Sequence, residues 1–307
     1  MDSILAQTYA NFIVFAVDDG STDGCGEILD EYAQKDRRIV VIHQKNRGIG
    51  AARNTGLEVL ERSADFEFVA FVDSDDRVSN RYLETLVSEA VATQADIVIC
   101  GLNRFDESGI LPSREIAYPK KQLSKEMFVS LVFSVKEGKN KIGSGGYSFK
   151  QLFRASVVKG IRFPVGKLVE DEYYCVSSIR NATIIRYLPD KLIDYRQRAD
   201  SFVHTPGVDE KLAIGRRLCI PIAAKISEYA GEIATAAYIT AVINNYKNSG
   251  ISEEIPKNIL SSALAAKNKG LITAKTYYRA KCLYCHPNLA KGLFRLRKLF
   301  RKSLRFL

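Results

Sequence analysis

One stretch constrains the fold of this chain more than any other: residues 66–76 read Phe-Glu-Phe-Val-Ala-Phe-Val-Asp-Ser-Asp-Asp. An apolar run rich in β-branched and aromatic residues is typical of a strand that is buried on both faces of a sheet. The run stops at three carboxylates, Asp73, Asp75 and Asp76, which would then lie at the carboxyl end of the strand. In open α/β sheets, ligands bind at that edge.

The acidic end of this strand has two interpretations. Carboxylates two residues apart can converge on one hard cation, and Mg²⁺ or Mn²⁺ is held by one or two carboxylates together with phosphate oxygens. Alternatively, the acids form a turn that caps the next helix, whose pattern begins near Asn80. A D-x-D pattern does not decide between the two, so the rest of the chain must.

Strands and helices alternate through the first 100 residues. We expect strands over residues 12–17, 39–43, 66–72 and 97–100, with helices over 27–34, 51–61 and 82–93. This alternation predicts an α/β fold, in which a mostly parallel sheet is flanked by helices. The pattern loosens beyond residue 100 and becomes helical from about residue 208. We therefore expect three parts: residues 1–100, 101–205 and 206–307.

The charge is distributed unevenly. The net charge is +10, yet residues 1–100 carry 18 acids against 9 bases, so the remainder carries about +19. The acidic part contains the candidate metal site. The basic part is expected to meet an anionic partner such as nucleic acid, membrane lipid or a phosphorylated acceptor.

The sequence also bears on the compartment. No stretch approaches 18 consecutive apolar residues, and Met1 is followed by Asp2 rather than by a basic and then apolar segment. The six cysteines are irregularly spaced and are expected to be reduced. We expect a cytoplasmic protein. Neither His43 nor His204 has an evident partner, so we assign no role to either.

A series of short motifs extends over roughly residues 1–200: Ser3–Thr8, Val17–Asp23, Asn46–Gly48, Ala52–Gly56, Phe71–Asp76 and Glu170–Glu172. They occur in the order seen in family 2 glycosyltransferases of the GT-A fold, which this chain therefore resembles. Such enzymes move a sugar from a nucleotide diphosphate donor to an acceptor hydroxyl. The resemblance thus implies a GT-A (Rossmann-like) fold and a sugar-transfer reaction, with UDP as the expected nucleotide.

The resemblance also implies roles for individual residues. Asp19 is expected to accept hydrogen bonds from the base or ribose of the donor, unless it forms an acidic turn or a helix cap. Arg53 is expected to face the diphosphate, unless it is a solvated helix charge. Asp75, with Asp73, is expected to bind Mn²⁺ or Mg²⁺, which neutralises the leaving diphosphate. Arg198 lies in a segment that resembles the one closing over the donor phosphates.

Asp171 matches the position of the catalytic base. In enzymes that invert at the sugar carbon, one carboxylate removes the proton of the attacking acceptor hydroxyl. Glu170 or Glu172 could take this role instead. The structural alternative is the first turn of a helix, where the helix dipole favours acids.

The chain departs from the family pattern at its start. In the family, a strand, a Pro-x-Tyr-Asn turn and a helix lead into the segment matching Ser3, whereas Met1 here falls inside that helix. That strand is central in the sheet, so we expect an open slot between the strands at 12–17 and 68–72. Either the true start lies upstream, or the chain is a catalytically impaired remnant, or something else fills the slot.

Residues 288–307 form the last feature. They contain seven Lys or Arg and no acid, and apolar residues recur at spacings of three and four, which predicts a basic amphipathic helix. Such a helix can lie on an anionic membrane surface or dock on the preceding helices. Nucleic acid is a poorer partner, because no aromatic stacking platform accompanies the charge. We expect a saccharide or lipid-linked saccharide acceptor in surface polysaccharide or glycolipid synthesis; the alternative is a membrane-surface binding protein.

Overall fold

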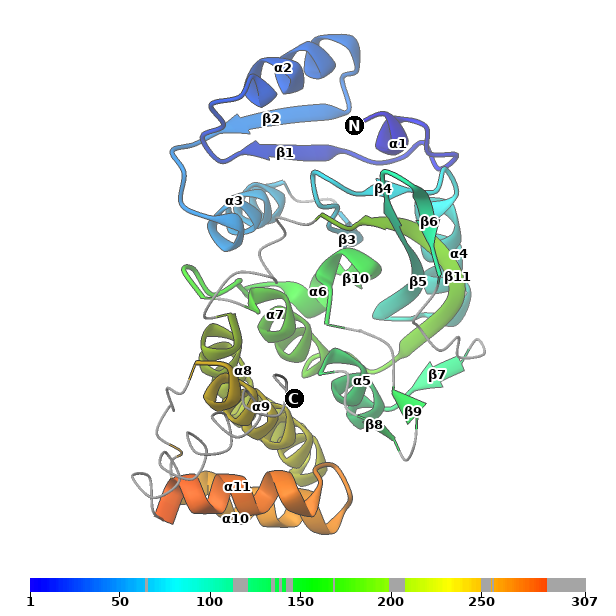
Figure 1. Ribbon diagram of the computed structural model, residues 1–307. Coiled ribbons are helices and arrows are strands. Elements are labelled where there is room, and N and C mark those ends of the chain that lie inside the picture. Colours follow the sequence, from blue (N-terminus) through cyan, green and yellow to red (C-terminus); the bar gives the residue numbers. More distant parts are fainter. Residues whose placement is uncertain are drawn as a thin grey trace.

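The computed structural model describes residues 1–63, 66–112, 121–133, 136–137, 140–141, 146–167, 169–198, 208–249, 255 and 257–285. Figure 1 shows an α/β part, coloured blue to green, and a separate group of helices, coloured yellow to orange. The strands are β1 (Val14–Asp18), β2 (Ile39–His43), β3 (Phe68–Ala70), β4 (Arg77–Val78), β5 (Ile97–Asp106), β6 (Gly109–Leu111), β7 (Lys121–Leu123), β8 (Lys136–Glu137), β9 (Asn140–Lys141), β10 (Gln151–Arg154) and β11 (Ile185–Arg196). The helices are α1 (Asp2–Leu5), α2 (Cys25–Lys35), α3 (Ile49–Arg62), α4 (Tyr82–Thr93), α5 (Lys125–Val132), the 3₁₀ turn η1 (Ser148–Lys150), α6 (Ala155–Val158), α7 (Glu170–Ile179), α8 (Val208–Ala224), α9 (Glu228–Ser249), α10 (Lys257–Asn268) and α11 (Ala274–Cys285).

The main sheet contains strands from both halves of the α/β part. Its order is β3-β10-β5-β11-β4, with β6 paired to β5 and β7 paired to β11. The predicted α/β class with a C-terminal helical region is confirmed, but the sheet is mixed rather than mostly parallel. Strand β10 runs antiparallel to both neighbours, and parallel pairing links β5 to β11 and β1 to β2. The alternation in residues 1–100 could not indicate this, because β10 and β11 come from beyond residue 150.

Strands β1 and β2 form a sheet of their own. Within the described residues, β1 pairs only with β2, and β3 pairs only with β10. The expected interruption between β1 and β3 is therefore present. The β1–β2 sheet still contacts the segment that leads into β3, since the Phe15 ring meets the Phe66 ring edge to face at 5.8 Å between centroids. Figure 1 shows the β1–β2 pair with α2 beyond it, set apart from the main sheet.

Strand β5 separates two apolar clusters. Successive side chains of a strand point to opposite faces. Accordingly, Ile97 and Ile99 join the cluster that contains Phe128 of α5 and Tyr174 of α7. Val98, Cys100 and Leu102 join the cluster that contains Leu86 of α4. The sheet is thus covered on both faces, as a strand with two buried faces requires.

The C-terminal helices have a third cluster, which includes Tyr238, Ile243 and Ile259. Helix α8 packs against both α7 and α9, so it joins this bundle to the α/β part. None of the helices in the described part of the chain combines the length and the apolar character needed to cross a membrane. The predicted basic helix over 288–307 lies outside the described residues.

Two buried tyrosines provide a matched test of this core. The hydroxyl of Tyr174 is buried without a hydrogen-bond partner, whereas that of Tyr82 donates to the Phe149 carbonyl at 3.2 Å. A buried polar group without a partner destabilises by about 1–3 kcal/mol. We expect Tyr174→Phe to raise the midpoint of thermal unfolding and Tyr82→Phe to lower it. Calorimetry of both variants checks this, and a lower midpoint for Tyr174→Phe would contradict it.

Candidate functional site

Arg53 lies at the centre of a cluster of carboxylates that come from separate segments. Its Nη2 donates to Asp73 Oδ1 at 2.7 Å, while its Nη1 donates to Asp171 Oδ1 at 2.8 Å and to Glu170 Oε1 at 3.1 Å. The Arg53 side chain is only 9% exposed. Burial by itself would lower the pKa of Arg53, but the facing carboxylates raise it above its ordinary value, so the guanidinium stays charged.

The position of Arg53 is fixed by its neighbour in the sequence. The Asn54 side chain donates to the Phe163 carbonyl at 2.9 Å and accepts from the Phe163 N–H at 2.8 Å. These two bonds join α3 to the segment that leads toward α7. Gly50, one turn earlier, allows that approach, since a Cβ there would lie 3.1 Å from the Pro164 carbonyl oxygen. Helix α3 therefore faces the first turn of α7, where Asp171 lies.

Asp171 is largely enclosed, with a side chain that is 15% exposed, and it is held through one of its two oxygens. Oδ1 accepts from Arg53 and, at 2.5 Å, from the hydroxyl of Ser148, which is fully buried in η1. Neither bond involves Oδ2. Burial raises the pKa of Asp171 to about 7, and the Arg53 guanidinium opposes that rise. A carboxylate with such a pKa can take up a proton near neutral pH.

The two acids beside Asp171 also form ion pairs. Glu170 binds Arg53, as described above. Glu172 forms a two-pronged ion pair with Arg216 of α8, with N–O distances of 2.9 and 2.8 Å. Both oxygens of Glu172 are thus engaged, whereas Glu170 and Asp171 each contact Arg53 through one oxygen, and Asp171 alone also accepts from Ser148.

The acidic turn after β3 contains the other expected metal ligand. Asp75 Oδ2 lies 2.5 Å from Nη2 of Arg198, and its backbone carbonyl accepts from Nε of Arg196 at 2.9 Å. Asp76 Oδ1 accepts from the Arg196 N–H at 2.9 Å, but its Oδ2 is buried without a hydrogen-bond partner in the described chain. Burial raises the pKa of Asp76 to about 7. Because α4 begins without a side-chain cap, the helix-capping interpretation of these acids is wrong.

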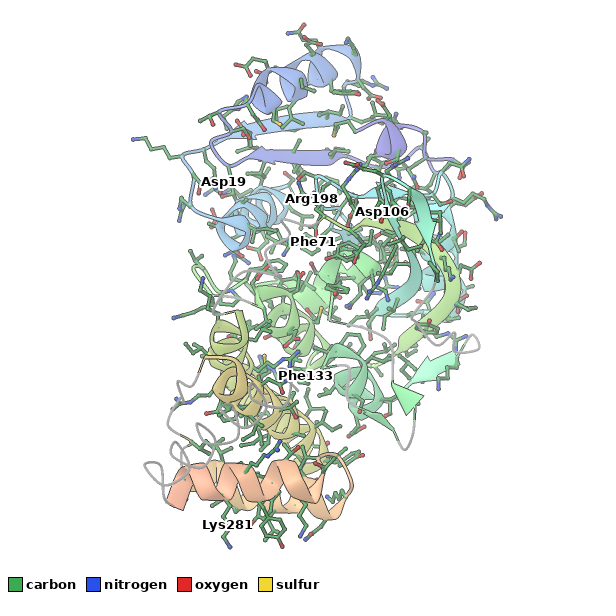
Figure 2. The ribbon with its side chains drawn as sticks, in the orientation of Figure 1. Asp19, Phe71, Asp106, Phe133, Arg198 and Lys281 are labelled. Atoms are coloured by element: carbon green, nitrogen blue, oxygen red, sulfur yellow. The ribbon has the colours of Figure 1, made fainter. Side chains whose placement is uncertain are left out.

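Asp19 does not join the Arg53 cluster. Its carboxylate accepts from Gln44 Nε2 at 2.6 Å, from the Arg47 N–H at 3.0 Å and from the Gly48 N–H at 2.7 Å. It therefore fixes the loop in front of α3, as the acidic-turn interpretation expects. In Figure 2, Asp19 and Arg198 both lie toward the part of the molecule that contains α3 and the β1–β2 sheet. A ligand-binding role for Asp19 stays a prediction.

The residues around the acidic turn fit a hard divalent cation by their chemistry. Five carboxylates face three guanidinium groups, which leaves excess negative charge: Asp73, Asp75, Asp76, Glu170 and Asp171 against Arg53, Arg196 and Arg198. Mg²⁺ and Mn²⁺ prefer oxygen ligands, and Asp76 Oδ2 is such an oxygen with no partner. Across the described residues, no group of three or more potential ligands converges as the side chains stand. Instead, Asp73 binds Arg53 and Asp75 binds Arg198.

Two residues with polar contacts, His43 and Ser148, were not predicted from the sequence. Nδ1 of His43 lies 2.9 Å from Asp18 and its Nε2 lies 3.0 Å from Asp30, although no role was expected for this residue. The hydrogen bonds of Asp18 with Ser21 and His43 lower the pKa of Asp18 to about 2. Ser148 is marked by no local motif. These three contacts join residues at least 13 positions apart, so no spacing rule indicates them.

Comparisons with known proteins agree with this geometry. Residues 1–158 match the family described as "Glycosyl transferase family 2". The chain is 33% identical to EpsH of Bacillus subtilis over 266 residues, which cover 81% of this chain and 73% of EpsH. It is 35% identical to the glycosyltransferase GlyA of Streptococcus pneumoniae over 204 residues, covering 66% of this chain but only 28% of GlyA.

Solved structures share the fold. Residues 1–349 of S. aureus TarS, solved in complex with UDP, align with a TM-score of 0.68 and 18% identity, covering 98% of this chain and 86% of that structure. This shared fold and the family match together identify the class of protein as a GT-A glycosyltransferase. This chain belongs to glycosyl transferase family 2.

The ion pairs of Arg53 should contribute to the stability of the folded protein. In Arg53→Met, three neighbouring carboxylates lose their cation. We expect the free energy of unfolding to fall by about 3–5 kcal/mol at pH 7.5. Mutual repulsion then raises the pKa values of the folded carboxyls above their unfolded values, so protonation favours the folded form. The loss should therefore be smaller at pH 5 than at pH 7.5.

Urea unfolding at the two pH values measures this difference. Arg186→Met, which breaks a pair with the single carboxylate of Glu89 (2.9 Å), is the control. An Arg53→Met loss that is equal at both pH values would show that the three carboxylates do not repel one another.

Proposed function

We propose that this enzyme transfers a sugar from a nucleotide diphosphate donor, UDP, to an acceptor hydroxyl with inversion at the sugar carbon. The observation that carries the proposal is the cluster at Arg53, in which Asp73 and Asp171 bind the same guanidinium. A group for the diphosphate and a group for the acceptor proton are then neighbours. TarS, which has been solved with UDP and with UDP-GlcNAc, supports this choice of donor.

Arg53 and Arg198 are proposed to bind the donor diphosphate. A guanidinium offers paired donors that suit phosphate oxygens as well as carboxylates. Arg198 is 55% exposed, so it can leave Asp75 without disturbing the core. Arg53 is buried, and it would keep its place while exchanging one carboxylate oxygen for a phosphate oxygen. Asp19 is proposed to contact the base or ribose from the loop in front of α3.

Asp73 and Asp75 are proposed to hold Mn²⁺ or Mg²⁺, with the unpaired oxygen of Asp76 available beside them. A bound cation supplies Lewis-acid neutralisation of the leaving diphosphate. The protein's own part is to keep the acidic turn in place, which Arg196 does by binding both the Asp75 carbonyl and the Asp76 carboxylate.

Asp171 is proposed to be the base. Arg53 and Ser148 fix Oδ1, so Oδ2 is left to accept the proton of the attacking hydroxyl. A pKa near 7 places this acceptance within the physiological range. The base must be ionised, so the rate should rise as pH increases through about 7.

The acceptor and the compartment are proposed from family membership and from the charge of residues 288–307. Family membership supports a saccharide or lipid-linked saccharide acceptor in surface polysaccharide or glycolipid synthesis. The basic residues of 288–307 support a cytoplasmic protein that lies at an anionic membrane surface. Neither part of this proposal depends on the Arg53 cluster.

A second candidate is a family member that no longer binds a donor. The separation of the β1–β2 sheet from β3 favours it, because the nucleotide would have to bind across this interruption. The two candidates differ in one simple property, the response of the protein to UDP.

We expect UDP with Mn²⁺ to raise the melting temperature of the wild type by several degrees, since a ligand of the folded state stabilises it. Asp75→Ala should lose this shift, because it removes a proposed metal ligand. Asp190→Ala, which removes an exposed carboxylate of β11, should keep it. An unresponsive wild type would favour the second candidate, and an equal shift in all three proteins would remove Asp75 from the metal site.

We expect Asp171→Asn to bind UDP as the wild type does but to lose transfer by at least about a hundredfold, because the base is gone. Ser148→Ala, which keeps the carboxylate but removes one of its hydrogen bonds, should retain part of the activity. Donor-binding calorimetry and a transfer assay on both variants separate the two effects. Undiminished turnover in Asp171→Asn would assign the base to another residue.

A further inference from the structure

Three aromatic rings are stacked beside the proposed base. Tyr147 and Phe149 lie on either side of Ser148 at η1, and Tyr195 belongs to β11. The ring centroids of Tyr147 and Phe149 are 5.0 Å apart, and the Tyr195 ring lies 5.6 and 5.5 Å from these two. Because the Ser148 hydroxyl donates to Asp171, the stack is joined to the proposed base through adjacent residues.

The stack has a buried floor and an accessible rim. Phe149 is only 3% exposed, and its backbone carbonyl accepts from the hydroxyl of the buried Tyr82 at 3.2 Å. Tyr147 and Tyr195 are partly exposed. The core therefore holds the rings in place, and a ligand can reach the two tyrosines.

The stack also adjoins the acidic turn. Arg196, the residue after Tyr195, binds the backbone carbonyl of Asp75 and the carboxylate of Asp76. Burial raises the pKa of Tyr195, and Tyr147 and the carboxylates of the turn raise it further. The accessible rings are thus neighbours of both the proposed diphosphate site and the proposed base.

The contacts of Asp171 distinguish a donor side from an acceptor side. Arg53 of α3, which is proposed to bind the diphosphate, contacts Oδ1 of Asp171 from one element, and Ser148 contacts it from η1. With inversion, the acceptor hydroxyl attacks the sugar carbon from the face opposite the leaving group. The acceptor is therefore expected on the η1 side of Asp171, where Tyr147 adjoins Ser148.

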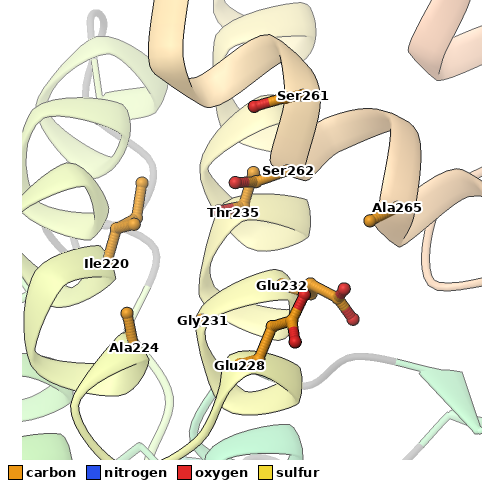
Figure 3. A pocket seen from close by; sticks show the side chains of 9 residues that line it. All are labelled: Ile220, Ala224, Glu228, Gly231, Glu232, Thr235, Ser261, Ser262 and Ala265. Atoms are coloured by element: carbon orange, nitrogen blue, oxygen red, sulfur yellow. The ribbon is translucent and has the colours of Figure 1, made fainter.

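Another concave region lies between α8, α9 and α10 (Figure 3). None of its lining residues belongs to η1, to β11 or to the acidic turn, and Asp171 is not among them. An acceptor hydroxyl in that region would not contact the proposed base. The surface beside the aromatic stack is thus the better place for the acceptor.

Aromatic rings beside carboxylates suit one chemical class of acceptor. A pyranose ring has a face of C–H groups, which packs against an aromatic ring, and it carries hydroxyl groups, which donate to carboxylates and to tyrosine oxygens. An acyclic polyol presents no such face. A lipid alcohol presents an apolar surface but too few hydroxyl groups for the surrounding acids.

We propose that Tyr147 and Tyr195 bind a pyranose ring of the acceptor, and so select a saccharide over an acyclic polyol or a lipid alcohol. The inference rests on the proposed function, because it takes Asp171 as the base. The acceptor hydroxyl gives its proton to Asp171 as its oxygen bonds to the sugar carbon, and the bond from that carbon to the diphosphate oxygen breaks. The two tyrosines position the acceptor and take no part in the proton transfer.

Saturation-transfer NMR of the full wild-type chain, with saturating UDP and Mg²⁺, tests this. The probes are the methyl β-D-pyranosides of glucose, galactose, mannose and N-acetylglucosamine, and glycerol is the acyclic control. We expect at least one pyranoside to bind, with stronger saturation from aromatic protons on one face of its ring than on the other, and glycerol not to bind. Absence of binding by every pyranoside, or equal saturation of both ring faces, overturns the inference.

Substitutions locate the bound ring. Tyr147→Leu and Tyr195→Leu should each weaken pyranoside binding about tenfold, because each removes an aromatic surface. Tyr147→Phe and Tyr195→Phe keep the ring and should bind nearly as the wild type does. Tyr278→Leu, which removes an exposed ring of α11, is the matched control and should change nothing. A retained UDP-dependent shift in melting temperature shows that a variant is folded.

Calorimetry with UDP, UDP-glucose, UDP-galactose and UDP-GlcNAc separates this inference from the proposed function. Both leucine variants should bind these nucleotides as the wild type does. Weaker binding of the UDP-sugars but not of UDP would place the sugar of the donor on the rings and overturn the acceptor assignment. A wild type that does not bind UDP would count against the proposed function. Normal UDP binding, with pyranoside binding that survives both leucine substitutions, would overturn the inference alone.

Discussion

The structure of the site depends on one buried cation among several anions. Arg53 binds carboxylates that are 20, 117 and 118 positions away in the chain, and it is almost fully enclosed. A charge in this position is tolerated only while its partners are in place. The chain must therefore bring α3, the turn after β3 and the start of α7 together in order to bury the α3 guanidinium at all.

The surrounding structure enforces that meeting from two sides. On one side, Asn54 binds both backbone groups of Phe163, which ties α3 to the segment before α7. On the other side, Glu172 binds Arg216 and so ties α7 to α8 of the C-terminal region. Adjacent residues of α7 thus serve different purposes, because Asp171 faces the cluster and Glu172 faces the helices. The helical region consequently supports the orientation of Asp171 without supplying a residue to the cluster.

Local sequence patterns predicted the parts of the fold that depend on local interactions. The bounds expected for β2 and α4, residues 39–43 and 82–93, are the observed ones. The strand expected over residues 66–72 is shorter than predicted, since β3 covers only Phe68–Ala70 and the acidic turn follows Phe71 and Val72 rather than the strand itself. The mixed sheet could not be predicted in this way, since the direction of β10 is decided by contacts with β3 and β5 rather than by its own four residues.

The site shows the same difference between features that local motifs predict and features that depend on contacts between distant segments. Motifs indicated Arg53, Asp73 and Asp171 as neighbours of one ligand, but not that these side chains bind one another. The role of Asp19 could not be settled by its motif, because the same carboxylate that would suit a ribose also suits the N–H groups of Arg47 and Gly48. Ser148 lies 23 positions before its partner Asp171, in a turn with no distinguishing pattern. Contacts of this kind follow from the fold and not from the spacing of residues.

The excess of carboxylates over guanidinium groups constrains how a donor could enter. A diphosphate brings further negative charge into a site that already repels it, so it can bind only if cations turn toward it. When Arg53 and Arg198 do so, Asp73 and Asp75 lose the partners that now neutralise them. Two partly buried carboxylates are then left unpaired, at a cost that a divalent cation between them and the diphosphate would remove. On the proposed function, donor and cation thus bind with positive coupling, because each removes the repulsion that opposes the other.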